Sequence, residues 1–412
     1  MVNVTRLYCG VRCRSDDLRY KESGNITLPV VVWNITRTCN LRCVHCYSDS
    51  EAHQYEGELR NDECRAVIEE LSRLRIPRLL ISGGEPLMRD DLIELLQYAH
   101  LNGLSIALST NGTLIDDLTA KELKLAGVEY VGISLDGVGA TNDHIRGISG
   151  AFNRAVCGLR NCKAVGMRVG IRMTLTKLNL DQIDAMFDLA LSECVDRLCF
   201  YHFIPVGRGK GYENLIPDTA QTRNAVERIL YRTLRAVEQG SFIEVLTVGS
   251  PVDSVFIYIK LLKGGSRRAD EVYKLMQLKS GAASSSGVGI ACIDHVGNVH
   301  PDQFWWHYSL GNVREMPFSK IWFENDDELL KKLREQKKHI YGRCKRCQFF
   351  ELCGGMRVKA DIILGDAFAS DPTCYLTDEE IGLKSDADQS HSFFCVGEHG
   401  VESRSQTALD RD

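Results

Sequence analysis

The feature of this sequence that most constrains its fold is a series of short apolar runs separated by amphipathic stretches. Six runs follow one another, VVVWNIT (30–36), LLISGG (79–84), SIALST (105–110), YVGISLDG (130–137), VGIRMTLT (169–176) and LCFYHFIP (198–205), and a seventh, FIEVLTVGS, lies at 242–250. Between the first two, 61–74 has apolar residues at helical spacing behind Asn61, the predicted N-cap. Nearly continuous apolar strands that alternate with helices predict an α/β fold with a parallel sheet covered on both faces.

Such a series of strands and helices either stays open, as in dinucleotide-binding sheets, or curls into a barrel. The loop after the first run has no G-x-G-x-x-G motif and holds cysteines instead, so the dinucleotide-binding fold loses its main support. We therefore predict a partial (β/α)6 TIM-type barrel over residues 29–250. In a barrel of this kind the loops that follow the strands build the active site.

The rest of the chain divides by composition. Residues 1–28 form an N-terminal extension, and residues 251–285 are predicted to be a linker that includes a Ser/Ala/Gly stretch. A smaller C-terminal domain is expected over 286–382, beginning with a hairpin that turns near Gly297–Asn298. Residues 383–412 are polar and are expected to form a loose tail.

Composition excludes several classes of protein. The 412 residues are 44% hydrophobic and 25% charged with a net charge of −5, which is typical of a globular protein without the basic face that nucleic-acid binding needs. No apolar stretch is long enough for a membrane helix, and the N-terminus does not resemble a signal peptide. We expect a cytoplasmic protein, where thiols stay reduced, so the clustered members of its sixteen cysteines indicate metal binding rather than disulfides.

The first cysteine cluster directly follows the first apolar run. Cys39, Cys43 and Cys46 have the spacing C-x3-C-x2-C. A zinc site or three unrelated thiols are the alternatives, but a structural zinc site normally has four protein ligands. Four-iron clusters are commonly held by cysteine thiolates. Three thiolates would leave one metal position open, which is useful for chemistry.

This loop, together with His45 and Tyr47, resembles the signature of radical S-adenosylmethionine (SAM) enzymes. The resemblance implies a [4Fe–4S] cluster whose open iron chelates SAM, and a 5′-deoxyadenosyl radical formed when SAM is cleaved. Three further strand ends, GGEP (83–86), STNG (109–112) and SLDG (134–137), match the family in order. They imply the following SAM-binding residues: Gly83, Gly84, Glu85, Ser109, Asn111, Ser134 and Asp136.

A second group of four cysteines lies near the C-terminus, Cys344, Cys347, Cys353 and Cys374. Structural zinc is the alternative, but the spacing resembles the outer auxiliary [4Fe–4S] cluster of the SPASM/twitch-type extension found on radical SAM enzymes. A full extension of that type has a second auxiliary cluster, with one ligand at the position that Arg357 occupies here. We therefore predict two [4Fe–4S] clusters in total, with Cys292 as a core thiol.

Several phrases, among them LYCG near the start, GNVHPDQFWWHYSLGNV (297–313) and DPTCYLTDEEIG (371–382), resemble radical SAM enzymes of tetrapyrrole biosynthesis. The resemblance implies removal of two acetate side chains from 12,18-didecarboxysiroheme in the alternative haem pathway. The alternatives are removal of propionates from the same substrate, as in haem d1 biosynthesis, peptide maturation, and a non-catalytic electron carrier or zinc scaffold. An external low-potential electron donor is also expected.

An iron tetrapyrrole is a flat apolar disc with carboxylates on its rim, so its pocket needs aromatic faces and cationic groups. Tyr201 and His202 at the sixth strand end are the candidate catalytic residues. The candidate substrate-binding residues are Arg208, Trp305, Trp306 and His307.

Overall fold

The structure is a computed structural model that describes residues 1–20, 28–279 and 286–383. Each of the seven apolar runs overlaps a strand of one parallel series, and three of the strands begin one or two residues before their runs. The strands are β2 (Val30–Asn34), β3 (Leu79–Ser82), β4 (Ile106–Thr110), β5 (Val128–Ser134), β6 (Arg168–Leu175), β7 (Arg197–His202) and β8 (Glu244–Val248). They belong to an eleven-stranded sheet with the order β1-β8-β7-β6-β5-β4-β3-β2-β9-β10-β11. The predicted partial barrel is confirmed, and the run at 242–250 adds a seventh parallel strand.

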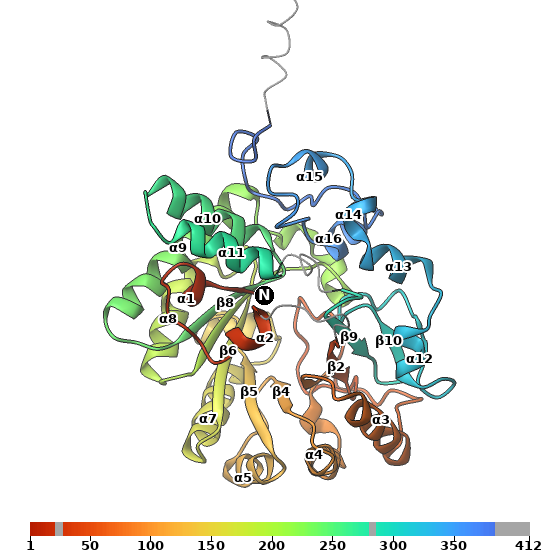
Figure 1. Cartoon of the computed structure of the whole chain (residues 1–412). Coiled ribbons are helices and arrows are strands. Elements are labelled where there is room, and N and C mark those ends of the chain that lie inside the picture. Colours follow the sequence, from red (N-terminus) through yellow and green to blue (C-terminus); the bar gives the residue numbers. More distant parts are fainter. Residues whose placement is uncertain (21–27, 280–285, 384–412) are drawn as a thin grey trace, which may run out of the picture.

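Helices cover the outer side of the curved sheet (Figure 1), and apolar side chains of both layers form the core. In α3, Val67, Ile68 and Leu71 are buried, as the spacing predicts, but the N-cap is Arg60 rather than Asn61, because the Glu63 side chain accepts from the Arg60 amide. The helices of this layer are α3 (Asn61–Leu74), α4 (Leu92–Leu101), α5 (Asp117–Leu125), α6 (Ala140–Arg146), α7 (Ala151–Ala164), α8 (Ile183–Ser192) and α9 (Thr219–Glu238), with short 3-10 turns at Pro86–Met88, Leu180–Gln182, Gly207–Gly211 and Glu213–Leu215.

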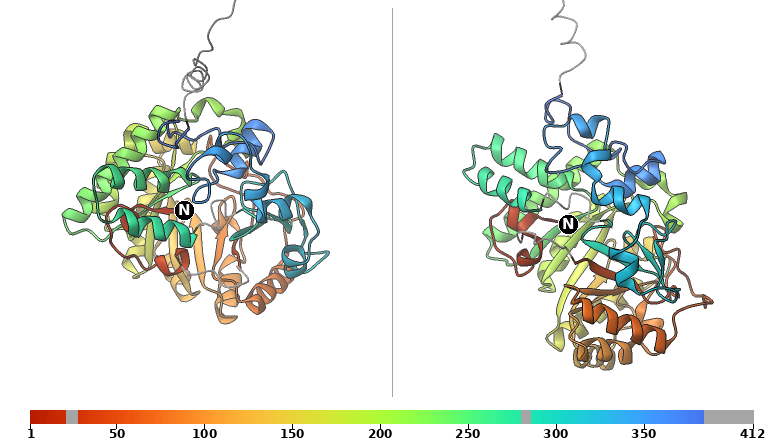
Figure 2. Two further views of the ribbon diagram at one scale, coloured as in Figure 1. Left: turned by 45° about the horizontal axis from the view of Figure 1, so that its top comes forward. Right: turned by 45° about the vertical axis from the view of Figure 1, so that its right-hand side comes forward.

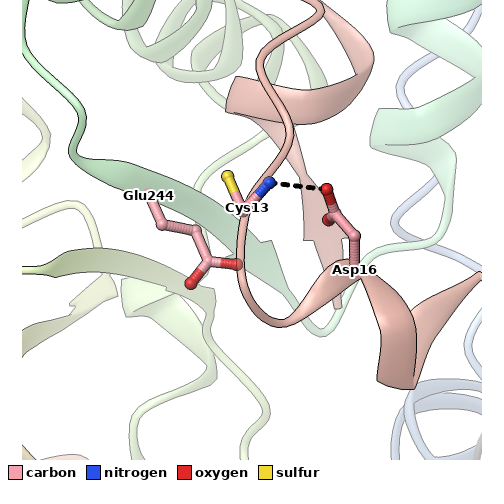
Figure 3. Close-up of side chains that lie close together, drawn as sticks. All are labelled: Cys13, Asp16 and Glu244. Atoms are coloured by element: carbon pink, nitrogen blue, oxygen red, sulfur yellow. Dashed lines mark hydrogen bonds between the residues drawn. The ribbon is translucent and has the colours of Figure 1, made fainter.

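The N-terminal extension lies at the edge of the sheet beside β8. Its strand β1 (Val2–Asn3) pairs antiparallel with β8, and the short helices α1 (Val4–Leu7) and α2 (Asp16–Arg19) follow. Cys13, Asp16 and Glu244 lie close together there (Figure 3). Arg19 and Arg197 contact Glu244 at 2.8 and 2.6 Å, and the Cys13 amide donates to Asp16 at 2.7 Å. We therefore interpret this group as an ion-pair network that holds the extension in place.

The region expected to be a linker contains two helices, α10 (Val252–Lys263) and α11 (Ala269–Lys279). After it, β9 (Ile290–Ile293) pairs in parallel with β2, and β10 (Asn298–His300) and β11 (Gly311–Asn312) extend the sheet (Figure 2). The hairpin turn lies at Gly297, whose φ of 92° is unfavourable for residues with a side chain. The C-terminal part is therefore continuous with the barrel sheet, and the proposed domain boundaries remain a prediction.

Five helices complete the described chain: α12 (Phe318–Phe323), α13 (Glu328–Arg334), α14 (Gln336–His339), α15 (Arg343–Arg346) and α16 (Arg357–Leu364). Residues from the end of this part reach the carboxyl ends of β6 and β7, where Lys359 and Thr373 line a small cavity together with Leu175 and His202. Of the predicted tail, 384–412 lies outside the described residues. Across the described ranges, no helix combines the length and apolarity that a membrane span requires.

Candidate active site

The loop after β2 brings its three cysteines to one cavity. Cys39 and Cys43 are buried, Cys46 is partly buried, and all three line a cavity of about 1130 Å³, with the space at its mouth included. Three thiols that face the same space are a suitable donor set for an iron–sulfur cluster.

The GGEP segment holds the start of this loop by backbone contacts. The amide of Gly84 donates to Thr36 O and that of Glu85 to Thr38 O, both at 2.8 Å. A Cβ atom at Gly84 would lie 2.4 Å from Thr38 O, and one at Gly83 would lie 2.3 Å from Thr36 O. Both positions must therefore be glycine for the two backbone segments to approach this closely.

A second segment, Ile145–Gly147, holds the middle of the cysteine loop. The amides of Arg42 and Val44 donate to the carbonyls of Arg146 and Ile145 at 3.2 and 3.0 Å. Gly147 has a φ of 76°, and a Cβ there would lie 2.5 Å from Arg42 O. The cysteine loop is thus fixed on two sides by the strand-end loops around it.

Arg208 clamps the same loop from a third side. Its guanidinium donates to the carbonyls of Cys43 and Ser50, both at 2.8 Å, and pairs with Asp49 at 3.0 Å. These contacts occupy the group that we expected to hold a substrate carboxylate. The structure therefore gives Arg208 a positioning role for the cysteine loop instead.

We expect Gly84→Ala to lower the iron content of the purified protein. The new methyl group would overlap two backbone carbonyls, so the cysteine loop must move away from the geometry that brings its thiols together. Iron per chain and visible absorption measure the effect. Gly211→Ala is the matched control, because a Cβ at Gly211 would contact nothing within 4 Å. Equal iron content in the two variants would show that the close approach of Gly84 to the cysteine loop is not needed for iron binding.

Glu85 is fully buried and is not one of the residues that line the cavity. Its carboxylate accepts from the Asn111 amide and the Thr110 hydroxyl, both at 2.7 Å. Burial raises its pKa to about 7, although these hydrogen bonds oppose the shift. The side chain of Asn111 lines the cavity and donates to Asn40 at 2.8 Å. In this geometry Glu85 positions Asn111, whereas Gly83, Gly84, Ser109 and Ser134 line the cavity themselves.

Asp136 also acts on its neighbours rather than facing the cavity. It contacts Arg146 at 2.6 Å and His45 at 2.7 Å. Burial alone would raise its pKa, but these two partners lower it to about 2, so it is ionised at neutral pH. The network joins the cysteine loop to Arg146, whose Nη1 lies 3.6 Å from Cys43 Sγ. Sequence reasoning missed Arg146, since a basic residue at a helix end is common.

Both candidate catalytic residues, Tyr201 and His202, line the cavity at the end of β7. The Nε2 atom of His202 lies 2.8 Å from Asp253, a fully buried residue in the first turn of α10. The hydroxyl of Tyr375 donates to the other Asp253 oxygen at 2.8 Å. The His202 pair is therefore linked to the residue that follows Cys374.

The three residues predicted to bind substrate in the aromatic segment, Trp305, Trp306 and His307, do not line the cavity. Trp305 is 1% exposed and packs in an apolar cluster with Ile204 and Leu333. Trp306 stacks on His295 and His300, and His307 is exposed and pairs with Asp361. The cavity is lined instead by the two preceding residues, Gln303 and Phe304.

The C-terminal cysteines also come together. Cys344, Cys347, Cys353 and Cys374 line a second cavity of about 380 Å³. The amides of Phe349 and Asp371 donate to Cys347 and Cys344 sulfur atoms at 3.3 Å. Four thiols with amide donors around one small cavity are a donor set suited to a closed cluster.

Arg357 occupies the position for which the resemblance to a full SPASM extension implies a further cluster ligand. It is fully buried, and its guanidinium donates to the carbonyls of Gly354, Ala367 and Ala369 at 2.7–2.9 Å. Cys292, predicted to be a core thiol, is buried and accepts from Asn34 at 3.4 Å.

Comparison with protein families agrees with this geometry. Residues 33–190 match the radical SAM superfamily, and residues 286–348 match the iron–sulfur cluster-binding domain SPASM. The chain is 46% identical to Fe-coproporphyrin III synthase of Methanosarcina barkeri, over 93% of this chain and 99% of the relative. It is 39% identical to pre-heme d1 synthase of Dinoroseobacter shibae, over 88% and 89%.

Solved structures show the same fold. Streptococcus suis SuiB bound to S-adenosylmethionine matches with a TM-score of 0.65 at 19% identity, over 85% of this chain and 79% of that one. Native anSMEcpe with bound AdoMet matches with a TM-score of 0.65 at 20% identity, over 84% and 94%. With a cysteine loop at the mouth of a partial barrel and a relative that aligns over nearly its whole length, the chain belongs to the radical SAM superfamily.

Proposed function

We propose that this radical SAM enzyme removes the two acetate side chains of 12,18-didecarboxysiroheme and gives Fe-coproporphyrin III. The observation that carries the proposal is the 46% identity, over nearly the full length of both chains, to Fe-coproporphyrin III synthase. Removal of propionates from the same substrate is the second candidate, supported by the 39% identity to pre-heme d1 synthase. Both cysteine groups need reduced thiols to bind a cluster, and thiols stay reduced in the cytoplasm, where we place the protein.

We assign the catalytic [4Fe–4S] cluster to Cys39, Cys43 and Cys46. When bound, this cluster and SAM supply the 5′-deoxyadenosyl radical. Ser109, Asn111 and Ser134 offer the polar groups that orient SAM in the cavity. The apolar part of the lining, Leu41, Leu80, Phe203, Ile204 and Phe304, suits a flat apolar substrate and limits water near a reactive radical.

We assign one auxiliary [4Fe–4S] cluster to Cys344, Cys347, Cys353 and Cys374, which gives two clusters in total. The buried Arg357 supports this count. Its guanidinium is bound to backbone carbonyls at the position where a second auxiliary cluster would need a cysteine thiolate. An external low-potential donor would supply electrons.

His202 is the proposed proton donor. After a hydrogen atom has been removed from the substrate, expulsion of the acetate group breaks one C–C bond. The fragment that leaves then needs one electron and one proton to become acetate. His202 lines the cavity, and Asp253 fixes the orientation of its ring through Nε2. The other ring nitrogen is then free to exchange a proton in the cavity.

We expect Asp253→Asn to lower product formation by about 10²-fold, within the range that a positioned proton donor contributes. Iron content and SAM affinity should stay unchanged, because Asp253 contacts neither candidate cluster site directly. The measurement is the ratio of released acetate to 5′-deoxyadenosine. Tyr375→Phe is the matched control, since it removes only the hydroxyl on the second Asp253 oxygen and should have a smaller effect. An unchanged ratio in Asp253→Asn would show that the contact between Asp253 and His202 has no part in the proton transfer.

The proposed function is tested by incubating the reduced protein with SAM and didecarboxysiroheme under anaerobic conditions and weighing the tetrapyrrole product. We expect the mass of Fe-coproporphyrin III and two acetates per tetrapyrrole. Loss of propionate-derived fragments would favour the second candidate. SAM cleavage without any change in the tetrapyrrole would refute both.

A further inference from the structure

Arg172 on β6 is a cation inside the cavity, and no sequence motif pointed to it. Its guanidinium lines the cavity and donates to the hydroxyl of Ser109 on β4. To reach Ser109, the side chain crosses β5 at Gly132, which is the ladder neighbour of Ser109. A Cβ atom at Gly132 would lie 2.3 Å from Nε of Arg172. The glycine therefore provides the space in which the guanidinium lies.

The charge of Arg172 is not balanced by the protein. The other arginines around the barrel interior have acidic partners: Arg146 has Asp136 at 2.6 Å, and Arg197 has Glu244 at 2.6 Å. Within the described parts of the chain, no carboxylate oxygen lies within 4.0 Å of the Arg172 guanidinium.

The groups nearest to Arg172 carry no compensating charge. Tyr130 and Tyr201 lie close enough to influence it, but burial raises the pKa of both phenols, so they are neutral at physiological pH. An unpaired cation in a largely enclosed space is costly, and an anionic ligand would remove that cost.

We propose that Arg172 binds a side-chain carboxylate of the tetrapyrrole substrate and so fixes the ring against the β5–β6 wall of the cavity. This inference rests on the proposed function and deepens it. A guanidinium can hold a carboxylate by two parallel hydrogen bonds, which fixes orientation as well as position. The iron tetrapyrrole has carboxylates on its rim, and the predicted cation for that role, Arg208, is occupied at the cysteine loop.

SAM also has a carboxylate, but the geometry favours the substrate. The cysteine loop follows β2, and β6 is four positions away in the sheet. The cation that lies at the cysteine loop is Arg146, with its Nη1 3.6 Å from Cys43 Sγ. The carboxylate of a SAM molecule bound at this loop would therefore lie closer to Arg146 than to Arg172.

The test compares binding of didecarboxysiroheme and of SAM by Arg172→Gln, Arg172→Lys and the wild type. We expect Arg172→Gln to weaken tetrapyrrole binding by about ten- to hundred-fold, as for loss of a charge-assisted hydrogen bond, and to change SAM affinity by less, through the lost hydrogen bond to Ser109 alone. Arg172→Lys should be intermediate, because it keeps the charge without the two-pronged geometry. Gly132→Ala should act in the same direction as Arg172→Gln, since it displaces the guanidinium and keeps its charge.

The methyl-esterified tetrapyrrole, which has no free carboxylate, should bind equally to the wild type and to Arg172→Gln. Iron content and circular dichroism identify any variant that has lost its fold, and Gly132→Ala tests the same contact independently. Loss of SAM affinity with unchanged tetrapyrrole affinity would overturn the proposal, as would equal binding of the acid form by all variants. If the wild type neither binds nor converts didecarboxysiroheme, the proposed function fails. If it does both and Arg172→Gln matches it, only this inference fails.

Discussion

A variant in which Cys39, Cys43 and Cys46 are all replaced by Ala will not cleave SAM and will keep about four irons per chain, the load of one remaining four-iron cluster. The three thiols line the large cavity, whereas the C-terminal cysteines line a separate one, so the two sites should lose their metal independently. The loop itself is held by backbone hydrogen bonds from the segments around Gly84 and Gly147, which the substitutions leave in place. Iron analysis and 5′-deoxyadenosine release under reducing conditions measure both effects.

Cys162→Ala is the matched control for this variant. Cys162 is buried in α7, apart from both cavities, so its loss should leave eight irons per chain, about four at each site. SAM cleavage by the triple variant would show that another site holds the catalytic cluster. Complete loss of iron from the triple variant would show that the C-terminal cysteines do not hold a cluster by themselves.

Replacement of Cys353 by Ala should leave SAM cleavage detectable while product formation falls by more than about tenfold. The four C-terminal thiols surround a cavity of about 380 Å³, and loss of one ligand from a four-thiolate set removes the closed coordination of an auxiliary cluster. Cys374 precedes Tyr375, which contacts the Asp253–His202 pair at the wall of the active cavity. A cluster held by these cysteines would therefore lie near the proposed proton donor, where it could return an electron.

Elemental analysis decides which metal the C-terminal site holds. We expect the wild type to contain about eight irons per chain and the Cys353 variant about four, without zinc in either. One zinc and about four irons in the wild type would contradict the auxiliary cluster. Cys292→Ala, which removes a buried thiol beside β2, controls for general loss of stability. Full product formation by Cys353→Ala would remove the auxiliary site from the reaction.

The strands of the barrel and the two cysteine groups were predictable because their signals are local in the sequence. A buried parallel strand needs a short apolar run, and β2 to β8 each overlap one of the seven runs. A loop that brings three thiols to one cavity needs them within a few residues, as at Cys39, Cys43 and Cys46. The glycines of GGEP were also visible, although only the structure shows that they make room for the carbonyls of Thr36 and Thr38.

The sequence by itself therefore determined the α/β class, the parallel strand series and the cysteine sets, since these follow from periodicity and short spacing. Only the tertiary structure decided the roles of the charged residues, because the residues that pair with a buried charge lie far away in the sequence. Arg208 was expected at the substrate and instead pairs with Asp49, 159 positions earlier in the chain (208 − 49). Arg172 has no acidic partner among the described residues because β4 and β5 present a serine and a glycine to it, an arrangement that only strand register creates.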